Sequence, residues 1–128
     1  MTDINKLSSK VIGAAIEVHK HLGPGLLESA YEECLCYEFD LDKLSYARQK
    51  ALPIIYKGKE LDCGYRLDIV VENQLILELK SVEKIEPIHK AQLLTYLKLA
   101  DISLGLILNF NVELMKDGIV RIVNNFEE

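Results

Sequence analysis

The first forty residues carry apolar side chains three or four positions apart, the spacing that places them on one face of an α-helix. This spacing predicts a helix over residues 4–22, which Thr2 or Asp3 can cap and which Gly23-Pro24-Gly25 ends. A second helix is expected over residues 26–40. Its apolar stripe consists of Leu27, Ala30, Tyr31, Cys34, Leu35 and Phe39.

Beyond residue 50 the period changes to that of β-strands, with one further helix. We expect strands over residues 51–56, 61–71, 74–82, 104–110 and 119–123, with turns at 57–59, 72–74 and Asp117-Gly118. Pro87 can begin a helix that runs to about Ala100, because the first helical position needs no N–H donor. The order of elements predicts the α/β class, with a mixed central β-sheet flanked by helices.

The length of 128 residues suits a single domain spanning residues 1–128. The hydrophobic fraction of 49% and the charged fraction of 27% are ordinary for a globular protein in water. No apolar run approaches the roughly 20 residues that cross a bilayer, and the N-terminus lacks the features of a signal peptide. We therefore expect a cytoplasmic protein with no membrane partner.

The cysteine count and the net charge restrict the classes of function that the chain can have. Cys34, Cys36 and Cys63 form neither an even disulfide set nor a metal site of suitable spacing, so buried free thiols are expected. The formal net charge of −5 argues against a strong, sequence-independent grip on duplex DNA by this chain alone, since such binding depends on basic groups that neutralise phosphates. An acidic total is still compatible with a local basic groove.

Two neighbouring strands are expected to bring acidic side chains together. Alternation places Glu78 and Lys80 on one face of the strand 74–82. If Asn73 is the centre of the preceding turn, Asp68 faces Glu78 and Arg66 faces Lys80. Side chains opposed in this way have Cβ atoms about 4.5–5.5 Å apart. Two carboxylates this close repel unless a cation lies between them, and Mg²⁺ suits one or two carboxylates together with water.

Lys80 would lie beside this ion, where its ammonium group can neutralise a phosphate or orient an attacking water. The alternative is a solvated salt bridge, because acid–x–lysine triplets are common in strands. In the following helix Gln92 and Tyr96 share one face, with His89 one turn earlier. This polar stripe can overhang the acidic site, or it can simply edge the core.

Taken together, these motifs resemble a known family. Gly64-Tyr-Arg-Leu-Asp68, Glu78-Leu-Lys80 and Gln92-Leu-Leu-Thr-Tyr96 are similar to the RecB-type branch of the PD-(D/E)XK nuclease superfamily, which has a Q-x-x-x-Y helix. Upstream, Leu22-Gly-Pro-Gly-Leu-Leu-Glu28-Ser-Ala-Tyr31 resembles the signature of the GxxExxY proteins, with Gly25, Glu28 and Tyr31 at the named positions. Gln49 before Pro53 and residues 106–110 also look like that family, so the resemblance covers nearly the whole chain.

The resemblance implies a restriction-endonuclease-like core and a divalent metal, Mg²⁺ or Mn²⁺, held mainly by Asp68 and Glu78. It implies that Glu28 touches the metal directly or through water, and that Lys80 assists the water or the phosphate. Gln92 and Tyr96 would position the substrate or support the metal's surroundings.

Some RecB-type proteins add a histidine ligand, for which His19 and His21 are the candidates here; the alternative for both is a surface or capping histidine. Tyr31 can instead be a core residue. Glu28 can instead be an acid that the N-terminal end of a helix dipole stabilises.

The leading hypothesis is a Mg²⁺-dependent nuclease that hydrolyses phosphodiester bonds of nucleic acid, with DNA the expected substrate. The alternative is a non-catalytic nuclease-fold module that binds nucleic acid or a protein partner, which the small size and the negative net charge favour. A third hypothesis is a subunit that works only in an assembly, as a homodimer or with a partner protein.

Overall fold

The structure, a computed structural model of the chain, describes residues 3–125, so Thr2 lies outside the described residues. The α-helices of this range are α1 (Ile4–Leu22), α2 (Glu28–Leu41) and α3 (Pro87–Ala100). The strands and the 3₁₀ helix are β1 (Tyr46–Ala51), β2 (Ile54–Tyr56), β3 (Lys59–Leu61), β4 (Arg66–Val71), β5 (Leu75–Lys80), β6 (Leu104–Asn109), η1 (Met115–Gly118) and β7 (Ile119–Val123).

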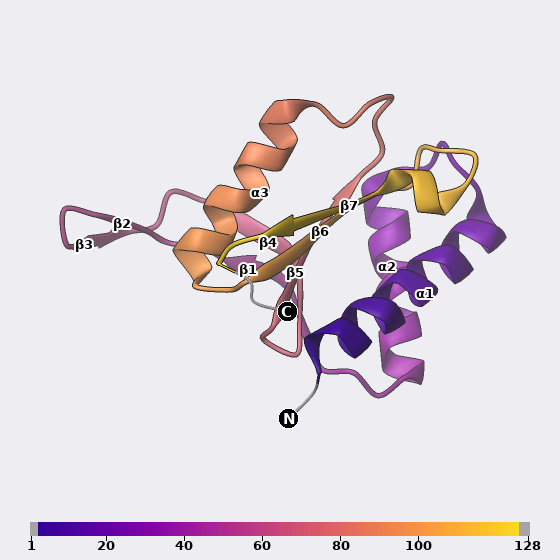
Figure 1. Cartoon of the computed structure of the whole chain (residues 1–128), viewed down its shortest axis with the longest axis horizontal. Helices are drawn as coiled ribbons and strands as arrows, with labels where there is room; N and C mark the ends of the chain where they lie inside the picture. Colours follow the sequence, from indigo (N-terminus) through magenta and orange to yellow (C-terminus); the bar gives the residue numbers. More distant parts are fainter. Residues whose placement is uncertain (1–2, 126–128) are drawn as a thin grey trace.

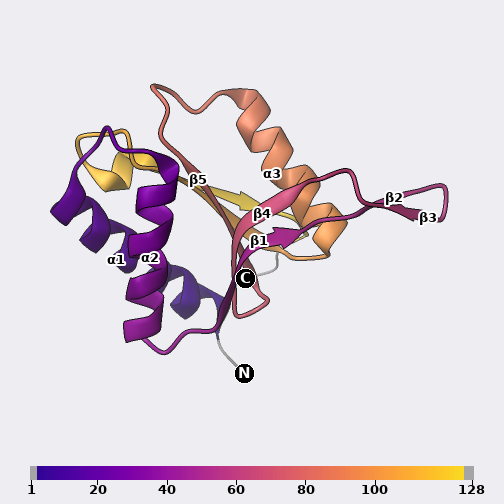
Figure 2. The same cartoon turned by 180° about the vertical axis from the view of Figure 1, so that it is seen from behind.

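A twisted five-stranded sheet forms the centre, with the order β1-β4-β5-β6-β7. The strands β5 and β6 run parallel, and their other neighbours in this sheet pair antiparallel. The parallel pair requires a crossover connection, which α3 supplies. The helices α1 and α2 lie on one side of the sheet and α3 lies on the other (Figures 1 and 2). This arrangement confirms the predicted mixed sheet flanked by helices.

Apolar side chains fill the space on both sides of the sheet. The larger cluster joins α1 and α2 to the face that carries Leu75, Leu77 and Leu79. The smaller one joins Leu93 and Leu97 of α3 to the opposite face. The strand β6 is buried along its whole length, as its continuous apolar run predicts. No helix within residues 3–125 has both the length and the apolar character that a membrane crossing requires.

Both ends of α1 follow the predicted signals. The side chain of Asp3 accepts a hydrogen bond from the backbone N–H of Asn5 at 2.8 Å, which caps the first turn. Gly23 ends the helix with φ of 69°, in the left-handed region that glycine tolerates. The Tyr31 hydroxyl then donates to the Gly23 carbonyl at 2.6 Å and accepts from the Leu26 N–H at 3.1 Å, so this side chain fixes the glycine-rich turn.

The Tyr31 ring is fully buried and stacks on Phe110, with ring centroids 4.3 Å apart. This confirms the alternative that Tyr31 is a core residue. The second helix begins at Glu28 rather than at residue 26, because Leu26 lies in the turn that Tyr31 holds and Leu27 has the extended backbone of an N-cap.

The predicted strand over residues 51–56 is wrong. The chain forms β1 earlier, over Tyr46–Ala51, and leaves the sheet at Leu52 and Pro53, where proline has no N–H for the ladder. Residues 54–61 instead form the separate hairpin β2–β3, and this arm extends away from the rest of the molecule (Figure 1). The predicted strand over residues 61–71 is likewise divided between β3 and β4.

The connection into the last strand also differs from the prediction. Asp117 and Gly118 belong to η1 at the end of a longer connection from Phe110, rather than to a tight hairpin turn. Gly118 lies directly against β6, where a Cβ atom would overlap the backbone carbonyl of Asn109. Its small size is therefore needed for close approach of two backbones.

The three cysteines are free, as predicted, but they are not equally buried. Cys36 is buried and Cys34 is half-buried, whereas Cys63 is exposed in the loop between β3 and β4. The expectation of buried thiols is therefore wrong for Cys63, because residues 62–65 leave the sheet.

Candidate metal centre

The site begins where β4 and β5 separate. Their ladder pairs Ile69–Val71 with Leu75–Leu77, in the register predicted from a turn centred on Asn73. Beyond Ile69 the ladder ends, and the Asp68 side chain replaces it: its Oδ2 accepts a hydrogen bond from the backbone N–H of Leu79 at 2.8 Å. Asp68 is therefore fixed against β5. It lies near Glu78, the residue that the register predicts to face it.

The strand β4 is irregular at this point. Strict alternation predicts Leu67 on the same face as Ile69 and Val71, but Leu67 packs with Val70 in the cluster beneath α3. Gln49 of β1, which the register places opposite Asp68, has φ of 48°. The alternation of side chains along β4 is therefore interrupted near Asp68, opposite a residue of β1 with a left-handed backbone.

Glu78 is the most enclosed of the predicted acids, with 9% of its surface exposed. It lies on the α3 face of β5, opposite the leucines that fill the larger cluster. Its Oε1 is buried and has no hydrogen-bond partner. Burial, followed by the charge of Asp68, raises the pKa of Glu78 to about 8. A carboxyl oxygen left without a partner in this position is one that a cation can bind.

Asp68 and Glu78 form an acid pair, and the groups around them shift the pKa values of both carboxyls. Burial also raises the pKa of Asp68, although the Leu79 N–H partly opposes this shift. Lys80, half-buried at the end of β5, lowers the pKa of both carboxyls through its positive charge. The two acids and the lysine are therefore within electrostatic reach of one another, as the alternation of β5 predicts.

The α3 side of the site carries Gln92 and Tyr96. The Gln92 amide donates to the Tyr96 hydroxyl at 2.8 Å. Burial and then the charge of Glu78 raise the pKa of Tyr96, which places this ring beside the acid pair. His89 has a different role, because its Nδ1 accepts from the backbone N–H of Glu86 at 2.9 Å and so caps α3.

Glu28 does not join the other two acids in a direct ligand set. It is exposed at the first turn of α2, and within residues 3–125 no three His, Cys, Asp or Glu side chains gather as a metal ion requires. The segment before it is nevertheless tied to the end of β5, because Ser81 Oγ donates to the Leu26 carbonyl at 2.8 Å.

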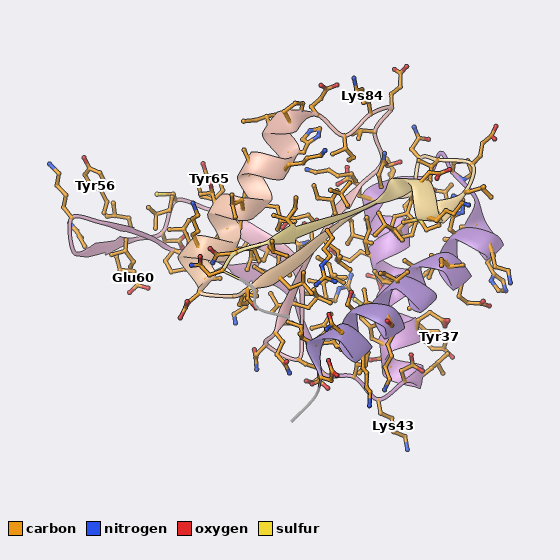
Figure 3. The ribbon with its side chains drawn as sticks, in the orientation of Figure 1. Tyr37, Lys43, Tyr56, Glu60, Tyr65 and Lys84 are labelled. Atoms are coloured by element: carbon orange, nitrogen blue, oxygen red, sulfur yellow. The ribbon has the colours of Figure 1, made fainter. Side chains whose placement is uncertain are left out.

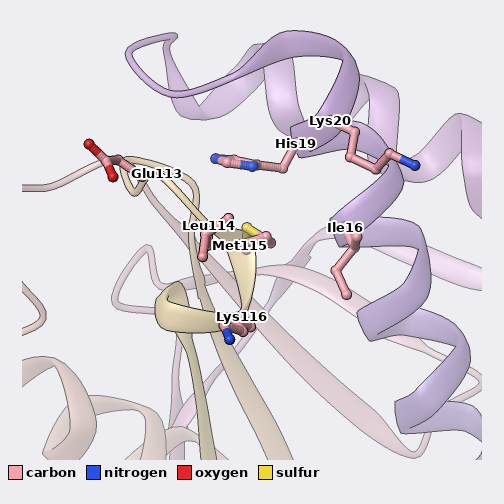
Figure 4. A pocket seen from close by; sticks show the side chains of 7 residues that line it. All are labelled: Ile16, His19, Lys20, Glu113, Leu114, Met115 and Lys116. Carbon is pink, nitrogen blue, oxygen red and sulfur yellow. The ribbon is translucent and has the colours of Figure 1, made fainter.

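The two histidine candidates are engaged elsewhere. His19 is buried, and its Nε2 lies 2.7 Å from the carbonyl oxygen of Val112. His21 is exposed and lies beside Glu17 on the same helix. A pocket of about 390 Å³ between α1 and η1 is lined by His19 but by none of the six predicted site residues (Figure 4).

Sequence reasoning missed a group that supports the site. Glu32 of α2 is buried, accepts from Arg48 at 2.8 Å and from Gln49 at 2.8 Å, and raises the pKa of Asp68 as a like charge. This ion pair and hydrogen bond attach α2 to β1 beside the break in β4. The sequence did contain a signal for this role: Glu32 directly follows Tyr31 and so lies at the edge of the apolar stripe of its helix, where an acidic side chain can be buried.

Asn109 was also missed. It is buried at the end of β6, and its side-chain amide binds the backbone N–H and C=O of Val82 at 3.1 and 3.0 Å. This pair of hydrogen bonds holds the segment that follows Lys80. Sequence reasoning placed Asn109 within an apolar strand, where its polarity was the available signal.

A comparison at the family level agrees with this geometry. The family model of the PD-(D/E)XK nuclease superfamily matches residues 5–122. The chain therefore belongs to the PD-(D/E)XK nuclease superfamily, and its mixed sheet and flanking helices are those of a restriction-endonuclease-like fold. Membership indicates a nuclease-type function, and nucleases of this superfamily generally use divalent metals. No curated protein and no solved structure matches the chain.

Proposed function

We propose that this protein hydrolyses phosphodiester bonds of DNA with the help of Mg²⁺ or Mn²⁺. The observation that carries the proposal is the unpartnered, buried Oε1 of Glu78 beside Asp68. Two carboxylates and several waters form a donor set that Mg²⁺ accepts. A divalent cation bound there would polarise a phosphoryl oxygen and make a water molecule more acidic.

The protein's own residues take complementary parts in this proposal. Asp68 and Glu78 hold the ion, and the Leu79 N–H keeps Asp68 in position. Lys80 offers an ammonium group to the phosphate or to the attacking water, and its charge offsets part of the negative charge of the acids. Gln92 and Tyr96 form one hydrogen-bonded unit that positions the substrate.

Glu28 keeps a more distant role in the proposal. Glu28 is exposed at the start of α2, and no third ligand side chain gathers with Asp68 and Glu78 among residues 3–125, so in this proposal a water molecule relays the contact from Glu28 to the ion. We expect Glu28→Gln to lower the rate less than Asp68→Asn does. Membership of the GxxExxY proteins and of the RecB-type branch, a cytoplasmic location and the single-domain span of residues 1–128 stay predictions.

The experiment compares cleavage of single-stranded and duplex DNA with 5 mM Mg²⁺ or Mn²⁺. We expect Asp68→Asn and Lys80→Ala to reduce the rate by at least about 100-fold, the scale of removing one preorganised charge from an active site. Matched controls are Asp62→Asn and Lys84→Ala, which change exposed residues outside the site. Equal rates in the wild type and in both site variants would overturn the proposal.

A second candidate is a non-catalytic nuclease-fold module that binds nucleic acid or a protein partner, alone or as a homodimer. It is favoured by the net charge of −5 and by the gathering of two acids rather than three among the described residues. Titration calorimetry with Mn²⁺ separates the two candidates. Heat of binding that Asp68→Asn removes supports the enzyme, and absence of binding at millimolar Mn²⁺ supports the module.

A further inference from the structure

A groove lies next to the candidate metal centre, and of its lining residues only Gln92 and Tyr96 have a part in the function proposed so far. It has a volume of about 320 Å³ and lies between α3 and the base of the β2–β3 arm. Its walls include Ile54, Tyr65, Ile88, Gln92, Tyr96 and Leu99. Asp68 and Glu78 do not line it, but Gln92 and Tyr96 belong to the candidate metal centre as well, so the groove adjoins that centre.

Tyr65 is held in place while its ring stays accessible. Its carbonyl accepts hydrogen bonds from the Leu52 N–H at 3.0 Å and from Arg66 at 2.8 Å, which fixes the backbone on both sides. The residue is nevertheless 43% exposed, and its ring centroid lies 6.0 Å from that of Tyr96. Figure 3 shows Tyr65 beside α3, far from Tyr56 at the outer end of the arm. The groove therefore offers an aromatic surface whose backbone is already ordered.

Charge also differs between the two helical sides of the molecule. The helix α3 carries Lys90 and Lys98 and no acidic residue, and the outer end of the arm carries Lys57 in its turn and Lys59 at the start of β3. On the other side of the sheet, α2 carries five acidic residues and no basic one. Glu60 and Asp62 of the arm and Glu86 and Asp101 at the ends of α3 balance these lysines, so they are separate positive groups rather than a basic face. The five carboxylates of α2 repel a polyanion from the other side more strongly, which leaves the side with the groove the more favourable one.

We propose that this groove binds an unpaired base of single-stranded nucleic acid, stacked on Tyr65, while the adjoining phosphates lie along the lysines of α3 and the arm. The inference rests on the proposed function and specifies its substrate class. A base within a duplex has both faces covered by its neighbours, so an exposed aromatic ring recognises a base that has left the stack. The apolar walls and the Gln92 amide fit the face and the polar edge of such a base.

The test is fluorescence anisotropy with EDTA present, so that binding is measured without hydrolysis. The probes are a labelled oligothymidylate of about twelve nucleotides, a length within the range that one binding fold covers, and an abasic strand of equal length. We expect the wild type to bind the thymidylate at least about fivefold more tightly than the abasic strand, the lower bound for one stacked base. Tyr65→Ala should abolish this difference, and Tyr65→Phe, which keeps the ring, should preserve it.

Tyr37→Ala is the matched control, since Tyr37 is 63% exposed on the acidic helix α2 and should leave both affinities unchanged. Circular dichroism establishes that each variant is folded. The inference fails if the wild type binds neither strand, if it binds both equally, or if Tyr37→Ala loses as much affinity as Tyr65→Ala. It also fails if Tyr65→Ala changes the oligomeric state in sedimentation, which would make the groove an interface between copies.

The outcome is separable from that of the proposed function. Base-dependent binding in EDTA together with unchanged hydrolysis in Asp68→Asn would contradict the proposed metal-dependent active site and support the proposed binding groove. Metal-dependent hydrolysis that Asp68→Asn abolishes, together with equal binding of the thymidylate and abasic strands, would do the opposite.

Discussion

At the scale of single residues, the unusual group is Glu78, whose charged form is destabilised by burial and by Asp68. In the absence of metal, the folded protein therefore holds a proton on the pair at a pH where the unfolded chain has lost it. Because folding raises the pKa of Glu78, its contribution to the free energy of unfolding is largest at and below about pH 4.5. It falls as the pH rises toward about 8.

We predict that urea denaturation in EDTA shows this decline, at roughly 1.4 kcal/mol for each unit of pKa shift. Glu78→Gln removes the titrating group and should flatten the profile, so that the variant is more stable than the wild type at pH 8. Glu60→Gln, an exposed change on the arm, should leave the slope as it is. A wild-type profile that has the same slope between pH 5 and 8 as that of Glu78→Gln would contradict the prediction.

The cysteines give a second prediction at this scale. Burial raises the pKa of Cys36 to about 11, so this thiol is both covered and protonated at pH 8. Cys63 is exposed and should react first with a disulfide reagent. Counting thiols against time should give one fast equivalent that Cys63→Ser removes, whereas Cys36 reacts only on unfolding. A fast equivalent that persists in Cys63→Ser would count against this assignment.

At the scale of elements, the long segments were predictable and the short ones near the site were not. The bounds of α1 and α3 follow from caps and apolar spacing, and the register of β4 with β5 follows from the turn at Asn73. The irregular backbone within β1 was not predictable, because Gln49 adopts a left-handed conformation while its side chain is bonded to Glu32 of α2. Local pattern carries no information about a partner on another helix.

The close contact between the end of η1 and β6 can be tested by measuring the free energy of unfolding of a Gly118 variant. Gly118→Ala puts a Cβ atom against the Asn109 carbonyl, and this backbone cannot move freely because β6 is buried. We expect a loss of about 1–3 kcal/mol or more in the free energy of unfolding. Gly13→Ala is the control: apart from the backbone of α1 itself, the added Cβ meets nothing within 4 Å, so helix propensity should make the protein about 0.5–1 kcal/mol more stable.

Urea denaturation at a single pH measures both glycine variants. Equal effects of the two substitutions would show that Gly118 is not in the close contact described. Asp117 is exposed, so Asp117→Ala should change the stability much less than Gly118→Ala. This comparison separates the steric role of Gly118 from any turn preference of the Asp117-Gly118 pair.

At the scale of the whole molecule, alternation and turn chemistry were sufficient for the register of β4 with β5, which brings Asp68 within electrostatic reach of Glu78, because these two strands are neighbours in sequence. They were insufficient for the arm and for Glu28. The arm exists because β1 ends at Ala51, and Glu28 is placed by the turn that Tyr31 holds against Phe110. Contacts between distant segments decide which acids can share an ion.

The same contacts make metal binding a property of the folded state alone. Asp68 and Glu78 come from two strands and are brought together by the sheet, so the unfolded chain has no preformed site. Mn²⁺ at 100 times its dissociation constant should therefore stabilise the protein by about 2.7 kcal/mol. For a domain of this size, that corresponds to a rise in Tm of roughly 10 °C. Differential scanning fluorimetry at pH 8 measures the rise.

Asp68→Asn should remove the response to Mn²⁺, whereas Asp62→Asn should keep it, because Asp62 lies exposed in the loop after β3. The response should also shrink as the pH falls from 8 to 5, since the proton held by the raised pKa of Glu78 competes with the ion for the same oxygen. A Tm shift that is equal in both variants, or that grows at lower pH, would place the ion elsewhere on the acidic surface, and α2 with its five carboxylates would be the first place to look.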